Sequence, residues 1–353
     1  MIISRTPFRI SFFGGGTDYP AWYRQHGGAV LAATIDKYCY LTCRYLPPFF
    51  EHRIRLVYRE IETCQTISQI RHPAVREGLK FLGIDRGIEL HHDGDLPARS
   101  GMGSSSAFTV GLLHALHALN GRMPSKKQLA TESIYLEQEV LGETVGSQDQ
   151  VMAAYGGLRH VRFESNGEIV AAPVVLSPER RAELQAHLML FYTGIARTAA
   201  EVAKTYVEGI DSRRRQLRLL QELVEESIDI LTSGKDIRVF GELLHEAWEA
   251  KRSLSDKVST TKVDALYERA RAAGAIGGKL TGAGGGGFLL LFAPPEQHQD
   301  IVEALKQLIH VPFAFESGGS QVIFYEPGID YQQVEKVRQG QKAARRKAWA
   351  SAA

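Results

Sequence analysis

A glycine- and serine-rich segment, PARSGMGSSSA from Pro97 to Ala107, has the residue types that bind a polyphosphate. Its two glycines would let the backbone approach a charged group, and three hydroxyl side chains follow where a helix is expected to begin. Free amides and the positive end of the helix dipole would then face the glycines, which predicts a phosphate cradle. A glycine turn with a serine N-cap is the structural alternative. The candidate phosphate-binding residues are Pro97, Gly101, Met102, Gly103, Ser104, Ser105 and Ser106.

A second glycine-rich segment, Gly282 to Gly287, matches GxGxxG but stands in the wrong order for a dinucleotide site. That fingerprint should follow a strand and open a helix, whereas here a helical pattern precedes it and the apolar stretch Phe288–Phe292 follows. The order disfavours a dinucleotide-dependent oxidoreductase. It favours a loop that lies against a ligand from another domain, with Gly282 as a candidate contact. The sequence contains no GxxxxGK[ST] loop and no HRD or DFG motif of protein kinases.

Charged residues close to glycines are the remaining candidates for chemistry. Arg9 lies on an expected strand, and Asp18 follows the glycine turn Gly14–Gly16. Asp149 lies in the segment GSQDQ, which is expected to be a polar loop. Carboxylates can accept protons and a guanidinium can neutralise phosphate charge. Taken singly, a turn role for Asp18 and a structural role for Asp149 remain open.

The elements that must position these residues change in kind along the chain. The first half alternates expected strands with helices, and the middle is strongly helical, with apolar residues at helical spacing over 213–232. A glycine loop, a strand, a helix and a last strand follow. This order predicts two α+β domains, over residues 1–185 and 186–353.

Composition excludes several classes of protein. The chain has 353 residues and a net charge of +2, so no overall field favours nucleic acid or an anionic membrane. Arg5 and Arg9 interrupt the stretch that a signal peptide would keep apolar, and Leu280 to Pro295 is too rich in glycine to be a membrane helix. The three cysteines are expected to be reduced thiols of a cytoplasmic protein. The oligomeric state stays open, a homodimer included, and the basic tail from Glu335 is expected to be a solvated helix.

Together, three segments resemble the ordered motifs of the GHMP small-molecule kinases. They are TPFRISFFG from Thr6, the Pro97–Ala107 loop, and KLTGAGGGG from Lys279. The resemblance implies the two-domain GHMP kinase fold, with a mixed α/β N-terminal domain and a C-terminal domain of helices plus an antiparallel sheet. It also implies ATP and Mg²⁺ as cofactors and a small-molecule acceptor.

The resemblance assigns roles to single residues. In galactokinases two glycines and a glutamate precede the catalytic aspartate at fixed spacings, and Gly146, Gly142 and Glu137 precede Asp149 at the same spacings. The resemblance therefore implies that Asp149 is the catalytic base and Glu137 a metal ligand. Ser105 would be the second metal-contacting residue, with Ser104 as the alternative. Arg9 matches the arginine beside that aspartate. The Thr17-Asp18 pair matches a segment that binds sugar hydroxyls, and the Glu-His that precedes it in galactokinases is Gly15-Gly16 here, which argues against galactose.

Within the family, the segments around Phe8–Tyr19 and His26–Tyr38 look most like those of bacterial heptose kinases. These phosphorylate the anomeric hydroxyl of D-glycero-D-manno-heptose 7-phosphate, on the route to GDP-heptose for surface polysaccharides. Such a substrate needs cations for its phosphate, and Arg197, Lys37 and Arg99 are candidates by position. Another acceptor sugar, such as L-fucose or mannose, and a non-catalytic sugar- and nucleotide-binding protein are the alternatives.

Overall fold

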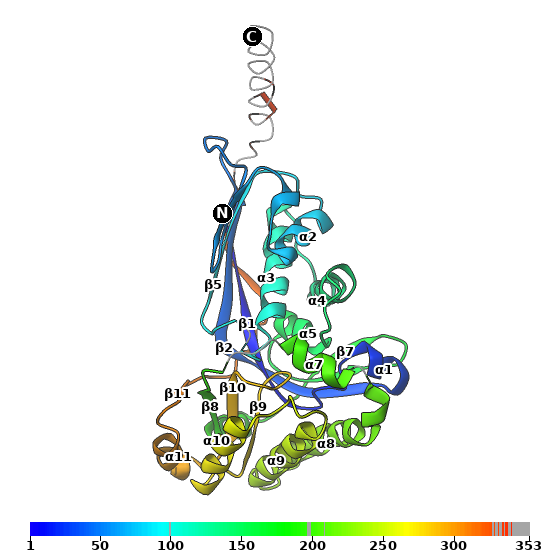
Figure 1. Cartoon of the computed structure of the whole chain (residues 1–353), viewed down its shortest axis with the longest axis vertical. Helices are drawn as coiled ribbons and strands as arrows, with labels where there is room; N and C mark the ends of the chain where they lie inside the picture. Colours follow the sequence, from blue (N-terminus) through cyan, green and yellow to red (C-terminus); the bar gives the residue numbers. More distant parts are fainter. Residues whose placement is uncertain are drawn as a thin grey trace.

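The computed structural model describes residues 1–98, 100–195, 199–207, 209–326, 328, 331, 334, 336, 337 and 340. Within these residues it contains two sheets that lie one after the other along the long axis of the molecule (Figure 1). The predicted fold class, a mixed α/β N-terminal part and a C-terminal part of helices and antiparallel strands, is confirmed. The predicted boundary at residue 185 stays a prediction.

The larger sheet has the strand order β12-β1-β2-β5-β3-β4, and β6 joins β2 to β7. All its pairs are antiparallel except β3 with β5. Its strands are β1 (Ile2–Phe13), β2 (Gly28–Tyr45), β3 (Ile54–Val57), β4 (Ile61–Cys64), β5 (Ile88–Gly94), β6 (Leu158–Phe163), β7 (Ile169–Pro173) and β12 (Gln321–Tyr325). The strand β12 therefore comes from the far end of the sequence and pairs with β1, the strand that carries Arg9.

Helices cover one face of the larger sheet (Figure 1). The central helix is α3, whose apolar residues pack on β1 and β2. The helices and turns of this half are α1 (Pro20–His26), η1 (Ile67–Gln69), α2 (Pro73–Phe81), α3 (Ser104–Leu119), α4 (Lys126–Tyr135), the π-helix η2 (Leu136–Val140) and α5 (Gln148–Tyr155). Ser125 caps α4, because its side chain accepts a hydrogen bond from the Gln128 amide.

The second sheet has the order β11-β8-β10-β9, and its strands are antiparallel. They are β8 (Leu188–Tyr192), β9 (Gly277–Leu280), β10 (Phe288–Phe292) and β11 (Ile309–His310). The accompanying helices are α6 (Pro178–Ala186), α7 (Ala199–Val207), η3 (Ile210–Arg213), α8 (Arg214–Thr232), α9 (Arg238–Arg252), α10 (Thr261–Ala272), η4 (Pro295–Gln297) and α11 (His298–Ala304). The stripe predicted for α8 is buried, apart from Ile228, which is half-buried.

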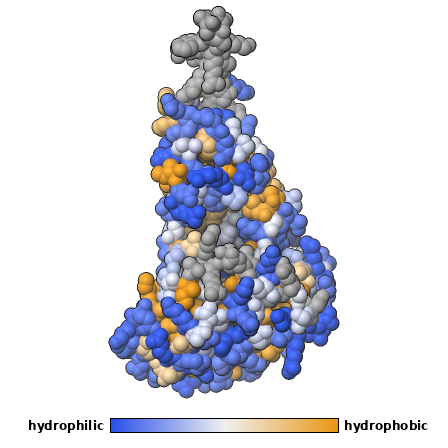
Figure 2. Space-filling view, in the orientation of Figure 1, coloured by the Kyte–Doolittle hydropathy of each residue, from blue (hydrophilic) through white to orange (hydrophobic). Residues whose placement is uncertain are grey.

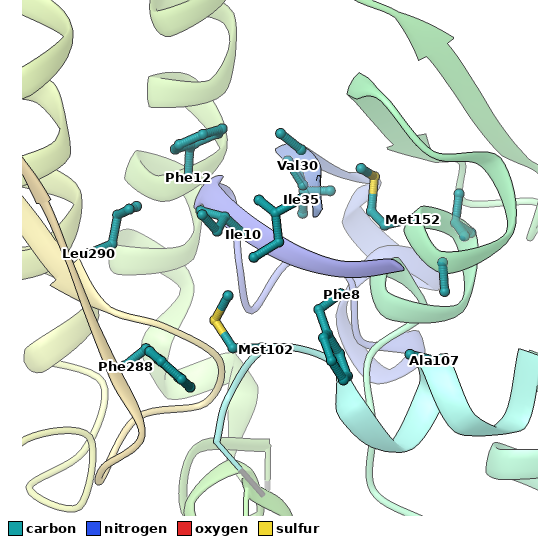
Figure 3. Close-up of a cluster of buried hydrophobic side chains, with 14 of the residues drawn as sticks. Phe8, Ile10, Phe12, Val30, Ile35, Met102, Ala107, Met152, Phe288 and Leu290 are labelled. Atoms are coloured by element: carbon teal, nitrogen blue, oxygen red, sulfur yellow. The ribbon is translucent and has the colours of Figure 1, made fainter. Parts of the chain in front are cut away.

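The strand β1 connects the cores of the two halves (Figure 3). Phe12 and Phe13 at its end pack edge-on against Phe240 of α9, with ring centroids 5.7 and 5.1 Å apart. Figure 3 also shows Met102 between β1 and the strand that carries Phe288 and Leu290. The apolar residues of β1 thus hold the first half of the chain against the second.

The outer face drawn in Figure 2 is mostly hydrophilic, with apolar residues scattered over it. The three cysteines are free thiols. Among the described residues, no helix combines the length and the apolar character that crossing a membrane would require.

Candidate active site

The segment that is predicted to cradle phosphate lies at the start of α3. Gly103 occupies the N-cap position with a φ of 73°, and no side chain caps the first turn. The structural alternative, a serine N-cap, is therefore wrong, because a glycine occupies that position. The first amides of an α-helix have no acceptor within the helix, and in α3 they follow directly on the glycines of this segment. Ser104, Ser105 and Ser106 form the first turn.

The second glycine segment packs directly on this cradle. Gly101 has a φ of 79°, and a Cβ on it would lie 2.5 Å from the Thr281 carbonyl oxygen. A Cβ on Gly282 would lie 2.5 Å from the Gly101 Cα, and one on Gly287 would lie 2.1 Å from the Ser100 carbonyl oxygen. Glycine is required at these contacts because two backbones meet there.

Arg9 and Asp149 form a bidentate ion pair beside the cradle. Arg9 Nε donates to Asp149 Oδ1 and Nη2 donates to Oδ2, both at 2.7 Å, and Nη1 donates to the Gly101 carbonyl oxygen at 2.7 Å. The expectation of a polar loop at Asp149 is wrong, because this residue lies in the first turn of α5. Its side chain is 23% exposed, against 5% for Arg9, so Asp149 is the partner that faces open space.

Glu137 reaches the same helix start from the other side. It lies on η2 and is fully buried, whereas Glu139, two residues further along η2, is exposed. Its Oε2 accepts hydrogen bonds from Ser106 Oγ, at 2.8 Å, and from Gln150 Nε2. Its Oε1 has no hydrogen-bond partner among the described residues. Burial raises the pKa of Glu137 to about 7, and the side chains of Thr109, Ser106 and Gln150 oppose this rise.

This arrangement suits a hard cation with few protein ligands. The unpartnered Oε1 of Glu137 and the exposed hydroxyl of Ser105 supply oxygen atoms, and Mg²⁺ usually keeps several waters and phosphate oxygens besides. The described residues contain no cluster of three or more His, Cys, Asp or Glu side chains that would hold a metal alone. Ser106, and not Ser105, makes the contact with Glu137.

Asp18 lies under the glycine turn, where it is buried. Its Oδ1 accepts a hydrogen bond from the Gly16 amide at 2.9 Å, and a Cβ on Gly146 would lie 1.9 Å from its Oδ2. Burial raises its pKa, and Asp149 adds to the rise. Thr17 is not placed to touch a ligand, because its hydroxyl is fully buried and bonds to the backbone of Gly14 and Ala29.

These groups surround a cavity of about 530 Å³. Of the predicted residues it is lined by Arg9, Gly15, Gly16, Asp18, Gly101, Gly103, Ser104, Ser105, Ser106, Asp149 and Gly282. Glu137 and Thr17, which are both fully buried, do not line it, and neither do Met102 and Pro97. The Met102 side chain is buried in the core shown in Figure 3, and Pro97 is exposed outside the lining.

A second cavity, of about 580 Å³, is also lined by Ser104 and Ser105. Its wall includes Phe108, His72 and His92, and the rings of His72 and Phe108 stack with centroids 4.8 Å apart. The two cavities share Ser104, Ser105 and Glu143. No pattern in the sequence points to this aromatic wall, because its members come from separate elements.

The sequence reasoning also missed two buried lysines. Lys251 of α9 lines the 530 Å³ cavity and donates to the Gly282 carbonyl oxygen, and Lys279 of β9 donates to the Phe12 carbonyl oxygen at 2.7 Å. Burial lowers the pKa of Lys251 to about 8, and Arg9 adds to this effect. A lysine on the apolar face of α9, in line with Leu244 and Ala247, was the available signal.

The structure describes only one of the three cations that are predicted to bind the phosphate of the acceptor. Lys37 bonds to Asp36 Oδ1 at 3.0 Å and is absent from the cavity lining. Arg197 and Arg99 lie outside the described residues.

Comparisons with known proteins agree with the motifs. Residues 66–157 match the GHMP kinases N terminal domain, and residues 219–310 match the GHMP kinases C terminal domain. The D-glycero-alpha-D-manno-heptose 7-phosphate kinase of Campylobacter jejuni is 26% identical over 334 residues, which cover 87% of this chain and 93% of that protein. A mevalonate kinase of Methanothermobacter thermautotrophicus is 31% identical over 258 residues, covering 67% and 78%.

A similar fold is found in a solved structure, a D-glycero-D-manno-heptose 1-phosphate kinase from Bacteriodes thetaiotaomicron. The TM-score is 0.76 at 22% identity, over 92% of this chain and all of that one.

Proposed function

The chain belongs to the GHMP kinase family, and on this premise we propose that it is a sugar kinase that transfers the γ-phosphoryl group of ATP to an anomeric hydroxyl. The acceptor that we propose is D-glycero-D-manno-heptose 7-phosphate, which would place the protein in surface polysaccharide biosynthesis in the cytoplasm. The similarity to the Campylobacter jejuni enzyme over most of both chains supports this acceptor. The observation that carries the kinase chemistry is the glycine N-cap of α3, Gly103, beside the Arg9–Asp149 pair.

Each of the two cavities that share Ser104 and Ser105 would bind one of the two substrates. The cavity with the stacked rings of His72 and Phe108 suits a flat aromatic base and would take the adenine of ATP. The triphosphate would then run along the first turn of α3 toward the cavity of Asp149, where the acceptor binds. Its terminal phosphate would lie between the two cavities.

Mg²⁺ would be held by Glu137 and Ser105. When bound, it would neutralise charge on the phosphate oxygens. Ser106 and Gln150 orient the Glu137 carboxylate by donating to its Oε2, and Oε1 accepts no hydrogen bond from the described residues.

Asp149 would accept the proton of the attacking hydroxyl. Arg9 grips both of its carboxylate oxygens, and such a bidentate pair fixes the orientation of the group as well as its position. Because Arg9 also bonds to the Gly101 carbonyl oxygen, the base is tied to the loop that holds the phosphates. Phosphoryl transfer depends mainly on such positioning and on electrostatic stabilisation.

A kinase assay over a panel of acceptors tests the proposal. ADP release with ATP and Mg²⁺ would be measured with D-glycero-D-manno-heptose 7-phosphate, its unphosphorylated form, L-fucose, mannose and mevalonate. We expect the heptose 7-phosphate to give the largest kcat/KM. A larger kcat/KM for fucose or mannose would overturn the proposed acceptor. If none of the sugars stimulated ADP release, the sugar kinase function would be overturned.

A further inference from the structure

Three buried polar side chains converge where Gly15 lacks a side chain. A Cβ on Gly15 would lie 3.6 Å from Ser11 Oγ, 3.8 Å from Gln148 Nε2 and 4.0 Å from Lys251 Nζ. The three side chains come from β1, α5 and α9, which are distant in sequence, and all three line the 530 Å³ cavity. We refer to Ser11, Gln148 and Lys251 as the Gly15 corner.

The Gly15 corner is polar but incompletely satisfied. Ser11 is 4% exposed and Gln148 is 8% exposed, and neither Ser11 Oγ nor Gln148 Oε1 has a hydrogen-bond partner among the described residues. Lys251 is 4% exposed, and the bond that it makes within the described chain is to an uncharged carbonyl. Buried polar groups without partners are costly, so a ligand that completes their bonds would bind strongly there.

The charges around the corner leave Lys251 available. Arg9 of β1 is committed to Asp149 and to the Gly101 carbonyl oxygen. Asp18 and Asp149 favour the protonated form of Lys251, whereas burial and Arg9 disfavour it. Lys279 of β9 is the other cation nearby, and it bonds to the backbone of β1. Lys251 is thus a cavity-lining cation with no carboxylate of its own in the described structure.

We propose that the Gly15 corner binds a hydroxyl group of the acceptor, close to the hydroxyl that is phosphorylated, and so selects polyhydroxylated acceptors. The inference rests on the proposed sugar kinase function. An ammonium and an amide N–H can donate to a hydroxyl oxygen, while Gln148 Oε1 and Ser11 Oγ can accept its proton. Gln148 immediately precedes the base Asp149, which puts the bound hydroxyl near the reacting one. Gly15 keeps the corner open.

A Gly15→Ala variant tests whether the space matters. Its Cβ would meet its neighbours only at ordinary contact distances, and Gly15 does not have a positive φ, so the variant should fold. We expect the KM for the sugar acceptor to rise about tenfold or more while the KM for ATP is unchanged. Gly328→Ala, at an open position, is the matched control and should leave both values unchanged. An unchanged KM for the acceptor in Gly15→Ala would overturn the proposal.

Lys251→Met, with the exposed Lys262→Met as its control, tests the contact itself. Kinetics would be compared on the full acceptor and on a set of analogues that each lack one hydroxyl. For one analogue we expect the wild-type kcat/KM to fall by about 10- to 100-fold, the effect of losing a hydrogen bond to a charged group. On that analogue Lys251→Met should cause no further loss.

Two results would overturn the inference while the sugar kinase function stands. One is a loss in Lys251→Met of the same factor on every analogue, and the other is a fall in kcat with an unchanged KM for the acceptor. Wild-type protein that phosphorylates no sugar would instead refute the proposed function, and the inference would fall with it. If Lys251→Met does not fold, Ser11→Ala and Gln148→Ala replace it. They too should cause no further loss on the one analogue that lacks the bound hydroxyl.

Discussion

The side chain of Asp149 is held by one partner and open on its other side. Arg9 takes both carboxylate oxygens, yet the side chain keeps access to the cavity. An Asn at this position has nearly the same shape but cannot accept the proton of the acceptor. We therefore expect Asp149→Asn to lower kcat by about 10²–10⁴-fold, the usual contribution of a general base.

The same variant should bind nucleotide normally, because the cradle amides belong to α3. Steady-state ADP release and the binding of a non-hydrolysable ATP analogue would check both expectations. Asp300→Asn, in the exposed first turn of α11, is the matched control. Near-normal turnover in Asp149→Asn would refute its role as the base.

Glu137 and Glu139 provide a natural pair for testing the metal site. Both lie on η2, but Glu137 is buried against Ser106 whereas Glu139 is exposed. We expect Glu137→Gln to raise the Mg²⁺ concentration needed for half-maximal activity by at least about tenfold, the usual minimum effect around a metal site. Glu139→Gln should leave the Mg²⁺ dependence unchanged, and equal shifts in the two variants would contradict the assignment. Mg²⁺ titrations at fixed ATP would make the comparison.

Lys251 should give the reaction an alkaline limit. Its pKa is lowered to about 8, mainly by burial, so the ammonium is present below that pH and is lost as the pH rises through it. We expect kcat/KM for the acceptor to fall above about pH 8. A guanidinium stays charged over this range, so Lys251→Arg should abolish that decline in whatever activity remains. A pH profile with the same alkaline limb in Lys251→Arg would show that another group titrates.

At the level of the elements, the glycine motifs were predictable and the side chains around them only in part. Gly101 and Gly282 occur in segments whose composition requires close backbone approach, and the structure brings them into contact. Lys251 stands on the apolar face of α9, which shows that it is buried but not what it contacts, because the contact with Gly282 depends on how α9 packs against the glycine loop. Thr17 was misjudged because its hydroxyl bonds to Ala29 of β2, a contact that depends on how β1 and β2 pair.

The aromatic wall of the 580 Å³ cavity illustrates a further limit of sequence reasoning. His72 lies at the start of α2, His92 on β5 and Phe108 on α3. These rings meet because three elements pack together, and no spacing along the chain records that packing. Charged residues next to glycine turns carry a local signal in the sequence, whereas a wall of rings from three separate elements does not.

The contact between the two glycine loops can be tested at Gly101. An alanine there would suffer a positive φ, which costs roughly 1–2 kcal/mol, and its Cβ would also lie 2.5 Å from the Thr281 carbonyl oxygen. Gly121→Ala is the control, since Gly121 has a positive φ of 68° but open space around it. We expect Gly101→Ala to lose more unfolding free energy than Gly121→Ala and also to lose affinity for ATP. Denaturant titrations and nucleotide binding would measure this, and equal losses in both variants would mean that the loops do not restrain each other.

For the whole molecule, β1 makes the two halves one mechanical unit. It pairs with β2 and β12 in the larger sheet, and its Phe12 and Phe13 pack on Phe240 of the second half. The phosphate cradle in the first half is likewise covered by the loop that follows β9 in the second. A nucleotide bound at the start of α3 would therefore lie next to the contact between the two halves, where Gly101 meets Gly282.

This coupling predicts that a non-hydrolysable ATP analogue with Mg²⁺ stabilises both halves together. At a ligand concentration 100 times its Kd, the free energy of unfolding should rise by about 2.7 kcal/mol. Because β1 belongs to both cores, scanning calorimetry should show one transition that moves as a whole to higher temperature. Phe240→Ala should weaken the contact between the halves, since losing a buried Phe costs about 3–5 kcal/mol, and should separate the transition into two. Two transitions in the wild-type protein, of which the nucleotide shifts only the first, would show that the halves unfold independently.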